Sequence, residues 1–427
     1  MQVQKTDSKY FSLKRNISWT LIGNIIYAIT QWALIIVIAR WSNPELVGQF
    51  SLALAYVSPL ILLSQLQLRA LQVVDTRGKY TFGNYAGIRI VITVVAVVVI
   101  PCILFIVGER EELVWLSIVI AIAKGFESIS DIIHGALQKR EQFQIISISK
   151  IGKGLLAIGA FAMGMYIWRD ALPDTRLLAA TACMAVAWAI QLVVYDIRKI
   201  RRYEAFRPDY RWGPMLELAV WGAPLGIVVM LSSLSTQIPR ILISRELGSH
   251  DLGIFSALGY LLTAGMIVSN AIGQAAAPRM SRLCHQRKLS ELHRLVIRLS
   301  AVGGVIGAIG ILIAVSVGKE LLELIYNADY AVHSLLLVVL LVSGMIDFIA
   351  TFFGYALTAM HAIKIQPYIA ALWTICAIVA TWLMLPHFGI IGAAYALIVS
   401  TGCRLILQVA VFYWRIRKSL LYHNDTD

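Results

Sequence analysis

One apolar segment of the 427-residue chain carries four ionisable side chains at regular spacing: Lys124, Glu127, Asp131 and His134. Intervals of 3, 4 and 3 residues place all four on one face of an α-helix. Ionisable groups within an apolar membrane segment cost about 2.5–3.5 kcal/mol each on insertion scales, so they normally face a partner or a water-filled cavity. Such a stripe can attract an anion through its lysine and can exchange a proton or Na⁺ at its carboxylates.

The composition is that of a membrane protein. Hydrophobic residues make up 59% of the chain and its mean hydropathy is +0.75, whereas about half of the residues of a soluble domain are apolar. A membrane-spanning helix needs about 20 apolar residues. The sequence therefore predicts an all-α bundle of about twelve transmembrane helices, over 15–39, 46–68, 86–107, 113–137, 146–168, 177–196, 214–243, 252–276, 293–317, 331–358, 367–385 and 390–414.

The distribution of Lys and Arg predicts the orientation. With a cytoplasmic N-terminus, 28 of the 37 basic residues fall in inner segments and seven in outer loops. Cytoplasmic loops carry the excess of positive charge in membrane proteins, so both termini are predicted to be cytoplasmic. We interpret the net charge of +13 as a topology signal and as attraction to anionic lipid, with no nucleic-acid partner.

The five cysteines include no CxxC pair, which predicts neither a disulfide framework nor a metal site.

A repeated phrase divides the chain into two halves. The pattern Arg, seven residues, Gly, one residue, Phe-Ser begins at Arg40 and again 205 residues later at Arg245. We therefore predict two six-helix lobes of equal orientation, 1–196 and 214–427, joined by a basic cytoplasmic linker, 197–213. Three dipeptides also recur in order at slowly growing offsets: Ile88-Arg89 with Ile297-Arg298, Val107-Gly108 with Val317-Gly318, and Ala136-Leu137 with Ala356-Leu357.

Depth counting along the predicted helices suggests partners for the stripe. Glu127 and Lys153 lie at similar depths in the antiparallel fourth and fifth spans, which predicts an ion pair. Asp131 and Lys150 likewise lie at similar depths, which predicts a second pair. Lys124 would then be a surplus cation that faces the interior of the lobe.

A third ion pair is predicted in the second half of the chain. Asp347 in the tenth span and Arg404 in the twelfth lie at similar depths in helices of equal direction. Two interpretations of all these charges are open at this point. They lock each lobe as structural pairs, or they form a cationic, polar cavity for an anionic substrate. In the second case the candidates for coupling-ion exchange are Glu127, Asp131 and Asp347.

Two segments resemble one family of transporters. The segment NPELVGQFS from Asn43 to Ser51, which follows Ala39-Arg40, resembles the polysaccharide-biosynthesis flippases of the Wzx type. These belong to the multidrug/oligosaccharidyl-lipid/polysaccharide exporter superfamily. The segment GIIGAAYA from Gly389 to Ala396 is similar to the opening of their twelfth helix.

The resemblance implies a V-shaped pair of lobes, as in MATE transporters, and alternating access. It implies that an undecaprenyl-diphosphate-linked oligosaccharide, such as an O-antigen or exopolysaccharide repeat unit, is flipped from the inner to the outer leaflet of the bacterial cytoplasmic membrane. No cofactor is expected beyond a coupling ion, H⁺ or Na⁺. We expect a monomer whose partners are the lipid-linked oligosaccharide and membrane lipids, with a glycan polymerase or chain-length protein as candidate protein partners.

The resemblance also places the first, second, seventh and eighth spans around the central cleft. Amide side chains in these spans suit sugar hydroxyls because each amide both donates and accepts hydrogen bonds. Hydrogen bonding between helices is the alternative role. Cations and amides together give the predicted substrate site: Lys124, Lys150, Lys153, Arg404, Asn24, Gln31, Gln65, Gln67, Gln237, Asn270 and Gln274.

An enzyme, a drug exporter and an assembly scaffold are the alternatives to a flippase. The chain contains no HExxH or GxSxG motif and no phosphate-cradling Gly-rich loop after a strand, so an enzyme is not expected. A membrane glycan polymerase or ligase should have a long outer loop bearing catalytic groups. A multidrug exporter of the same superfamily should have an acidic cavity for cationic drugs. A non-transporting assembly scaffold should tolerate the loss of Lys124, Lys150 and Lys153 together.

Overall fold

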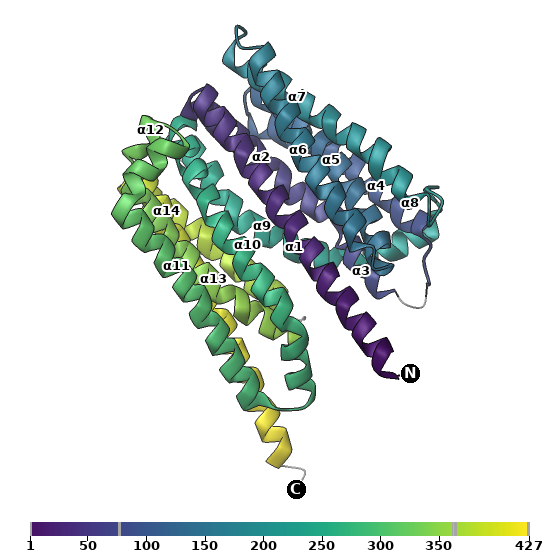
Figure 1. The fold of residues 1–427 in the computed structure, drawn as a ribbon. Helices are drawn as coiled ribbons and strands as arrows, with labels where there is room; N and C mark the ends of the chain where they lie inside the picture. Colours follow the sequence, from purple (N-terminus) through teal and green to yellow (C-terminus); the bar gives the residue numbers. More distant parts are fainter. Residues whose placement is uncertain (1, 76–77, 361, 363–364, 425–427) are drawn as a thin grey trace. The chain divides into compact units, whose positions relative to one another are not determined.

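The computed structural model describes residues 2–75, 78–360, 362 and 365–424, and within these residues it contains helices and short connections but no strand (Figure 1). Arg77 and Lys364, two basic residues of the topology count, lie outside the described residues. The elements follow in the order α1 (Gln2–Trp41), α2 (Pro44–Gln65), α3 (Leu68–Val74), α4 (Phe82–Val107), α5 (Glu111–Lys139), α6 (Phe143–Ile167), α7 (Pro173–Gln191), the π-helical turn η1 (Leu192–Ile197), α8 (Arg198–Ile200), α9 (Trp212–Glu246), α10 (Ser249–His285), α11 (Leu289–Ile325), α12 (Ala328–Ala331), α13 (Ser334–Ala359) and α14 (Gln366–Asn424).

Eleven helices of the described chain are long and apolar enough to cross a membrane. The last of them, α14, holds the two final predicted spans. It is interrupted at Gly389, whose φ of 57° and ψ of −143° lie in a region that glycine enters readily. The predicted division between residues 385 and 390 is therefore confirmed, and the all-α, polytopic class with it.

The chain forms two compact units. The first unit comprises the residues up to Ser42 together with Ala53–Met230, and the second comprises Asn43–Leu52 together with the residues from Leu231 onward. The change of unit therefore falls inside α2 and inside α9. The predicted lobes, 1–196 and 214–427, are defined by the sequence repeat, whereas the two units are defined by contacts between residues. Their boundaries therefore differ.

In the first unit, α6 packs against α1 and α7, and α5 packs against α4 and α7 (Figure 1). The start of α4 is fixed by a capping box, in which the Thr81 hydroxyl accepts from the Asn84 backbone N–H and the Asn84 side chain accepts from the Thr81 N–H. Because α4 begins at Phe82, four residues before the predicted start, Arg89 lies two turns inside the helix.

The second predicted span is broken where the sequence suggested continuity. Leu66 and Gln67 have φ angles of 46° and 51°, which non-glycine residues adopt rarely, and helix resumes only at Leu68 in α3. The carbonyl of Leu66 lies against α9, where a Cβ on Gly222 would come within 2.6 Å of it. Gly222 therefore allows α9 to pack closely against this break.

In the second unit, α13 packs against α10, α11 and α14. This unit also contains both glycines of the repeated phrase. A Cβ on Gly48 would lie 1.9 Å from the carbonyl oxygen of Ser249, and a Cβ on Gly253 would lie 1.8 Å from that of Pro44. Pro44 and Ser249 are themselves equivalent positions of the repeat, so the first turns of α2 and α10 contact each other reciprocally and closely enough to require glycine.

Candidate functional site

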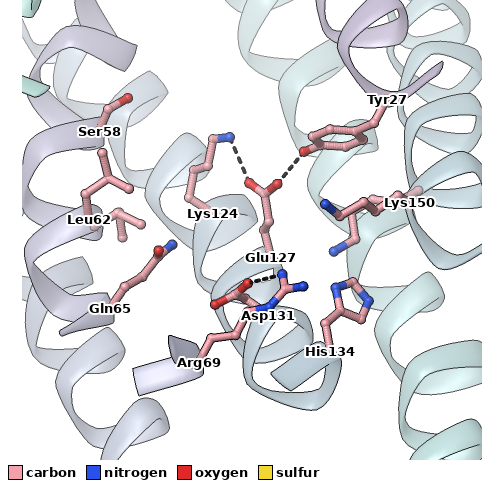
Figure 2. A pocket seen from close by; sticks show the side chains of 12 residues that line it. Tyr27, Ser58, Leu62, Gln65, Arg69, Lys124, Glu127, Asp131, His134 and Lys150 are labelled. Carbon is pink, nitrogen blue, oxygen red and sulfur yellow. Dashed lines mark hydrogen bonds and ion pairs between the residues drawn. The ribbon is translucent and has the colours of Figure 1, made fainter. Parts of the chain in front are cut away.

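The four residues of the α5 stripe line one cavity of the first unit, as the sequence predicted for a single helical face (Figure 2). Its volume is about 330 Å³. The other walls come from α1, α2, α3 and α6. The lining residues are Tyr27, Ser58, Ile61, Leu62, Gln65, Arg69, Lys124, Glu127, Asp131, His134, Lys150 and Lys153.

Glu127 is held by two neighbours. Lys124 donates from Nζ to one carboxylate oxygen at 2.8 Å, and the Tyr27 hydroxyl donates to the other (Figure 2). The predicted pair of Glu127 with Lys153 is therefore wrong. Lys124 lies one helical turn away on the same face, which makes it the nearer cation.

Asp131 is shared by two arginines. Arg69 of α3 donates from Nη1 to Oδ1 at 2.9 Å, and Arg89 of α4 donates from Nη2 to Oδ2 at 3.4 Å. The side chain of Arg89 is fully buried, so this carboxylate is its charge partner in the interior. The predicted pair of Asp131 with Lys150 is wrong because the two guanidinium groups occupy both oxygens.

The surplus positive charge lies on α6. Lys150 donates from Nζ to the side-chain oxygen of Asn24 at 2.7 Å and has no ion pair with a carboxylate that the structure describes. Lys153 is 3% exposed and has no hydrogen bond or ion pair with any residue that the structure describes; its ammonium is 6.0 Å from the centre of the Trp188 ring. The prediction that Lys124 is the surplus cation is therefore corrected to Lys150 and Lys153.

Three members of the site were not identified from the sequence: Arg69, Arg89 and Tyr27. The topology count includes both arginines among the inner basic residues, in the segment 69–89. The Thr81-x-x-Asn84 capping signature was the signal that α4 starts early enough to bury Arg89. Arg69, Lys150 and Lys153 line this cavity, and Arg89 lines a second one. Without these four, 24 inner basic residues remain against seven outer ones, so the charge asymmetry on which the predicted orientation rests is kept.

A second cavity of about 390 Å³ adjoins the first. The two share Gln65, Arg69 and Asp131, so the Arg69–Asp131 ion pair lies in the wall between them. The first cavity is lined by four cations and two carboxylates, a formal charge of +2 with His134 neutral. Its chemistry suits an anionic ligand that also presents hydrogen-bonding groups.

The remaining predicted residues are divided between the units. In the first unit, Gln65 lines both cavities and Gln67 lines the second, while the amide nitrogen of Gln31 is buried without a hydrogen-bond partner among the described residues. In the second unit, Gln237 accepts from Arg240 at 3.1 Å, the Asn270 carbonyl accepts from the Tyr355 hydroxyl at 3.4 Å, and Gln274 lies on α10. That these amides share one cleft stays a prediction.

The predicted ion pair of the second unit is confirmed. Arg404 donates from Nη1 to Asp347, and its guanidinium lies 4.6 Å from the centre of the Trp373 ring. No group of three or more His, Cys, Asp or Glu that could hold a metal ion occurs in the described part of the chain.

Comparison with known proteins agrees with this architecture. Residues 13–284 match the family described as polysaccharide biosynthesis protein. The chain is similar to the capsular polysaccharide biosynthesis protein CapF of Staphylococcus aureus, with 24% identity over 94% of this chain and 99% of CapF. It is also similar to a candidate O-antigen transporter of Salmonella typhi, with 26% identity over 58% of this chain and 57% of that protein.

Solved structures share the fold. An inward-facing multidrug resistance MATE family transporter of the MOP superfamily superimposes with a TM-score of 0.74 at 11% identity, over 93% of this chain and 98% of that one. The MATE transporter VcmN of Vibrio cholerae in its bent form gives 0.61 at 14% identity, over 98% and 99%. The family match covers more than half of the chain and shows that it belongs to the polysaccharide biosynthesis protein family, as a multi-pass protein of the bacterial cytoplasmic membrane.

Proposed function

We propose that the protein flips an undecaprenyl-diphosphate-linked oligosaccharide from the inner to the outer leaflet by alternating access, coupled to an ion. The observation that carries the proposal is the pair of cations on α6. Lys150 and Lys153 are one helical turn apart, both line the cavity, and neither has a carboxylate partner among the described residues. A bound diphosphate would give both ammonium groups the direct anionic partner that they lack among the described residues.

The rest of the cavity suits the sugar attached to the diphosphate. Gln65 and Asn24 carry amides, and Tyr27 and Ser58 carry hydroxyls, at or beside the cavity wall. Such groups hydrogen-bond sugar hydroxyls in either direction. The relatives support the substrate class, since CapF is named for capsular polysaccharide biosynthesis and the Salmonella typhi protein for O-antigen transport.

A drug exporter of the same fold is the competing function. Cationic drugs would have to enter a cavity that carries net positive charge, which like-charge repulsion opposes. We expect both termini to be cytoplasmic from the charge distribution, 24 inner basic residues against seven outer ones. The direction from the inner to the outer leaflet is what the family resemblance implies.

The test is deletion of the gene followed by analysis of lipid-linked repeat units. The proposed function requires that these units accumulate on the inner leaflet, and that wild-type protein but not the Lys150→Ala/Lys153→Ala variant clears them at equal protein level. Loss of drug resistance with normal surface glycan would instead assign the protein to the exporters. Normal flipping by the double variant would remove the support that the cavity gives.

A further inference from the structure

A buried carboxylate behind the cavity takes no part in the ion pairs of Arg69, Arg89 and Lys124. Asp196 lies on the π-helical turn η1 with its side chain 1% exposed. Ser149 of α6 donates to its Oδ1 at 2.5 Å, whereas Oδ2 is buried and has no hydrogen-bond partner among the described residues. A buried polar atom without a partner is costly, and single π-helical turns occur frequently at functional sites. A proton on this carboxylate would remove the buried charge.

His134 connects this carboxylate to the cavity. Its Nε2 lies 3.0 Å from the Ser149 hydroxyl oxygen and 3.8 Å from Asp196 Oδ1. Because the single hydroxyl hydrogen of Ser149 is given to the ionised carboxylate, Nε2 must carry a hydrogen and donate it to Ser149. Nδ1 is then the nitrogen that can accept a proton. His134 lines the cavity and Asp196 does not (Figure 2).

We propose that His134, Ser149 and Asp196 form the proton-binding site of this transporter, with H⁺ as the coupling ion; this rests on the proposed function. A proton arrives at His134 Nδ1, the Nε2 proton passes to the Ser149 oxygen, and the Ser149 proton passes to Asp196. The imidazole and the hydroxyl each gain one proton and lose one. The carboxylate gains one, so the charge of the site changes from −1 to 0.

The three carboxylates first considered for ion exchange are less suited to this role. Glu127 is bonded to Lys124 and Tyr27, and Asp131 to two arginines. Asp347 is bonded to Arg404. Protonation of any of them would break an ion pair with a lysine or an arginine, whereas Asp196 has no such pair among the described residues.

The site is also placed to sense the substrate. Lys153 acts electrostatically on both His134 and Asp196, and it is one of the two cations assigned to the diphosphate. Its charge favours the ionised carboxylate, and a bound anion would cancel this effect. Proton and anion should therefore bind cooperatively. The other charged or titratable groups that face the site or adjoin its turn are Arg69 on α3, Asp131 on α5, Tyr195 on η1, and Arg198 and Lys199 on α8.

The first test does not depend on transport. Infrared difference spectra of the purified full chain in lipid, recorded as the pH is lowered, should show the band of a newly protonated carboxylic acid. Part of this band should be lost in Asp196→Asn, and the same part should be kept in the matched variants Glu127→Gln and Asp131→Asn. Added farnesyl diphosphate should shift the appearance of that part to higher pH. A band of equal intensity in the wild type and in Asp196→Asn at every pH would overturn the proposal.

The second test uses proteoliposomes and a fluorescent farnesyl diphosphate analogue. A pH gradient should change the wild-type flipping rate, and the ratio of rates with and without the gradient should fall to unity in Asp196→Asn and His134→Gln but not in Glu127→Gln. Ser149→Ala gives a second variant of the relay, and melting temperature in detergent checks that each variant is folded.

The two proposals fail in different ways. A wild-type protein that flips at a rate independent of the gradient keeps the proposed function and loses the proton site. A wild-type protein that flips nothing loses the proposed function, while the infrared band still decides whether Asp196 takes up a proton.

Discussion

The two compact units treat charge within their spans differently. The cavity of the first unit is lined by six charged side chains, of which Lys150 and Lys153 have no carboxylate partner among the described residues. The second unit holds the Asp347–Arg404 pair, which is neutral as a whole and lies against the Trp373 ring. A duplicated helical frame therefore carries an excess of cations around the cavity of one unit and a self-compensated Asp347–Arg404 pair in the other. Function resides in the site and not in the frame that is repeated.

The largest effect should follow removal of both uncompensated cations. Each charge-assisted hydrogen bond to a phosphate contributes about 1.5–3 kcal/mol, so Lys150→Ala/Lys153→Ala should slow flipping on the order of a thousandfold. Flipping of a fluorescent lipid diphosphate in proteoliposomes measures this. Lys150→Arg/Lys153→Arg, which keeps the charge, is the matched control and should retain most of the rate. If the Lys124→Met/Glu127→Gln variant flips equally slowly, Lys150 and Lys153 do not contribute more to flipping than the Lys124–Glu127 pair, and the prediction is contradicted.

Asp131 should matter more for stability than Asp347. Asp131→Ala leaves Arg69 and the fully buried Arg89 without their carboxylate, and breaking a buried pair costs about 3–5 kcal/mol. Asp347→Ala leaves a single guanidinium, which still contacts the Trp373 ring. Melting temperatures in one detergent should therefore fall further for the first variant, and Arg89→Met should restore part of that loss. Equal losses would mean that Arg89 does not depend on Asp131.

The repeated glycines should be sensitive to a single methyl group. Gly48→Ala or Gly253→Ala places a Cβ under 2 Å from a carbonyl oxygen, and overpacking of this kind costs about 1–3 kcal/mol or more. Gly402→Ala is the control, because no atom lies within 4 Å of its Cβ position in α14 and alanine favours the helix. The melting temperature should drop for the first two variants only. A drop in just one of them would contradict the reciprocal contact.

The smallest effect is expected from neutralising the second unit's ion pair as a whole. Replacement of a buried pair by neutral groups is often close to neutral in energy, so Asp347→Asn/Arg404→Gln should change flipping by less than about threefold. The single variant Arg404→Gln should lower the melting temperature more than the double variant does. A large loss of flipping in the double variant would assign this pair a direct role in transport and weaken the contrast between the units.

Much of this architecture could be predicted from residue types and spacing. The number of spans, the α5 stripe and the Asp347–Arg404 pair all follow from counts along single helices, because depth and helical face are properties of one helix at a time. The break at Leu66 and Gln67 could not be predicted, since neither residue favours the left-handed conformation that it adopts.

The ion-pair and hydrogen-bond partners of the carboxylates in and beside the cavity could not be predicted from depth and helical face. Arg69 reaches Asp131 from a short helix that exists only because of that break, and Arg89 reaches it because a capping box starts α4 early. Asp196 faces Ser149 from a π-helical turn, and apolar periodicity gives no signal for a π turn. The partner of a carboxylate is the cation that helix packing brings nearest to it. This distance depends on the three-dimensional structure and cannot be counted along a single helix.

The reciprocal glycine contact between α2 and α10 has the geometry of an isologous interface. Residue i of one copy contacts residue j of the other, and j contacts i, as in a two-fold symmetric homodimer. The polypeptide thus carries, within one chain, the kind of surface through which a six-helix protein pairs with itself. A substitution at Gly48 or Gly253 therefore affects the packing of both helices at once.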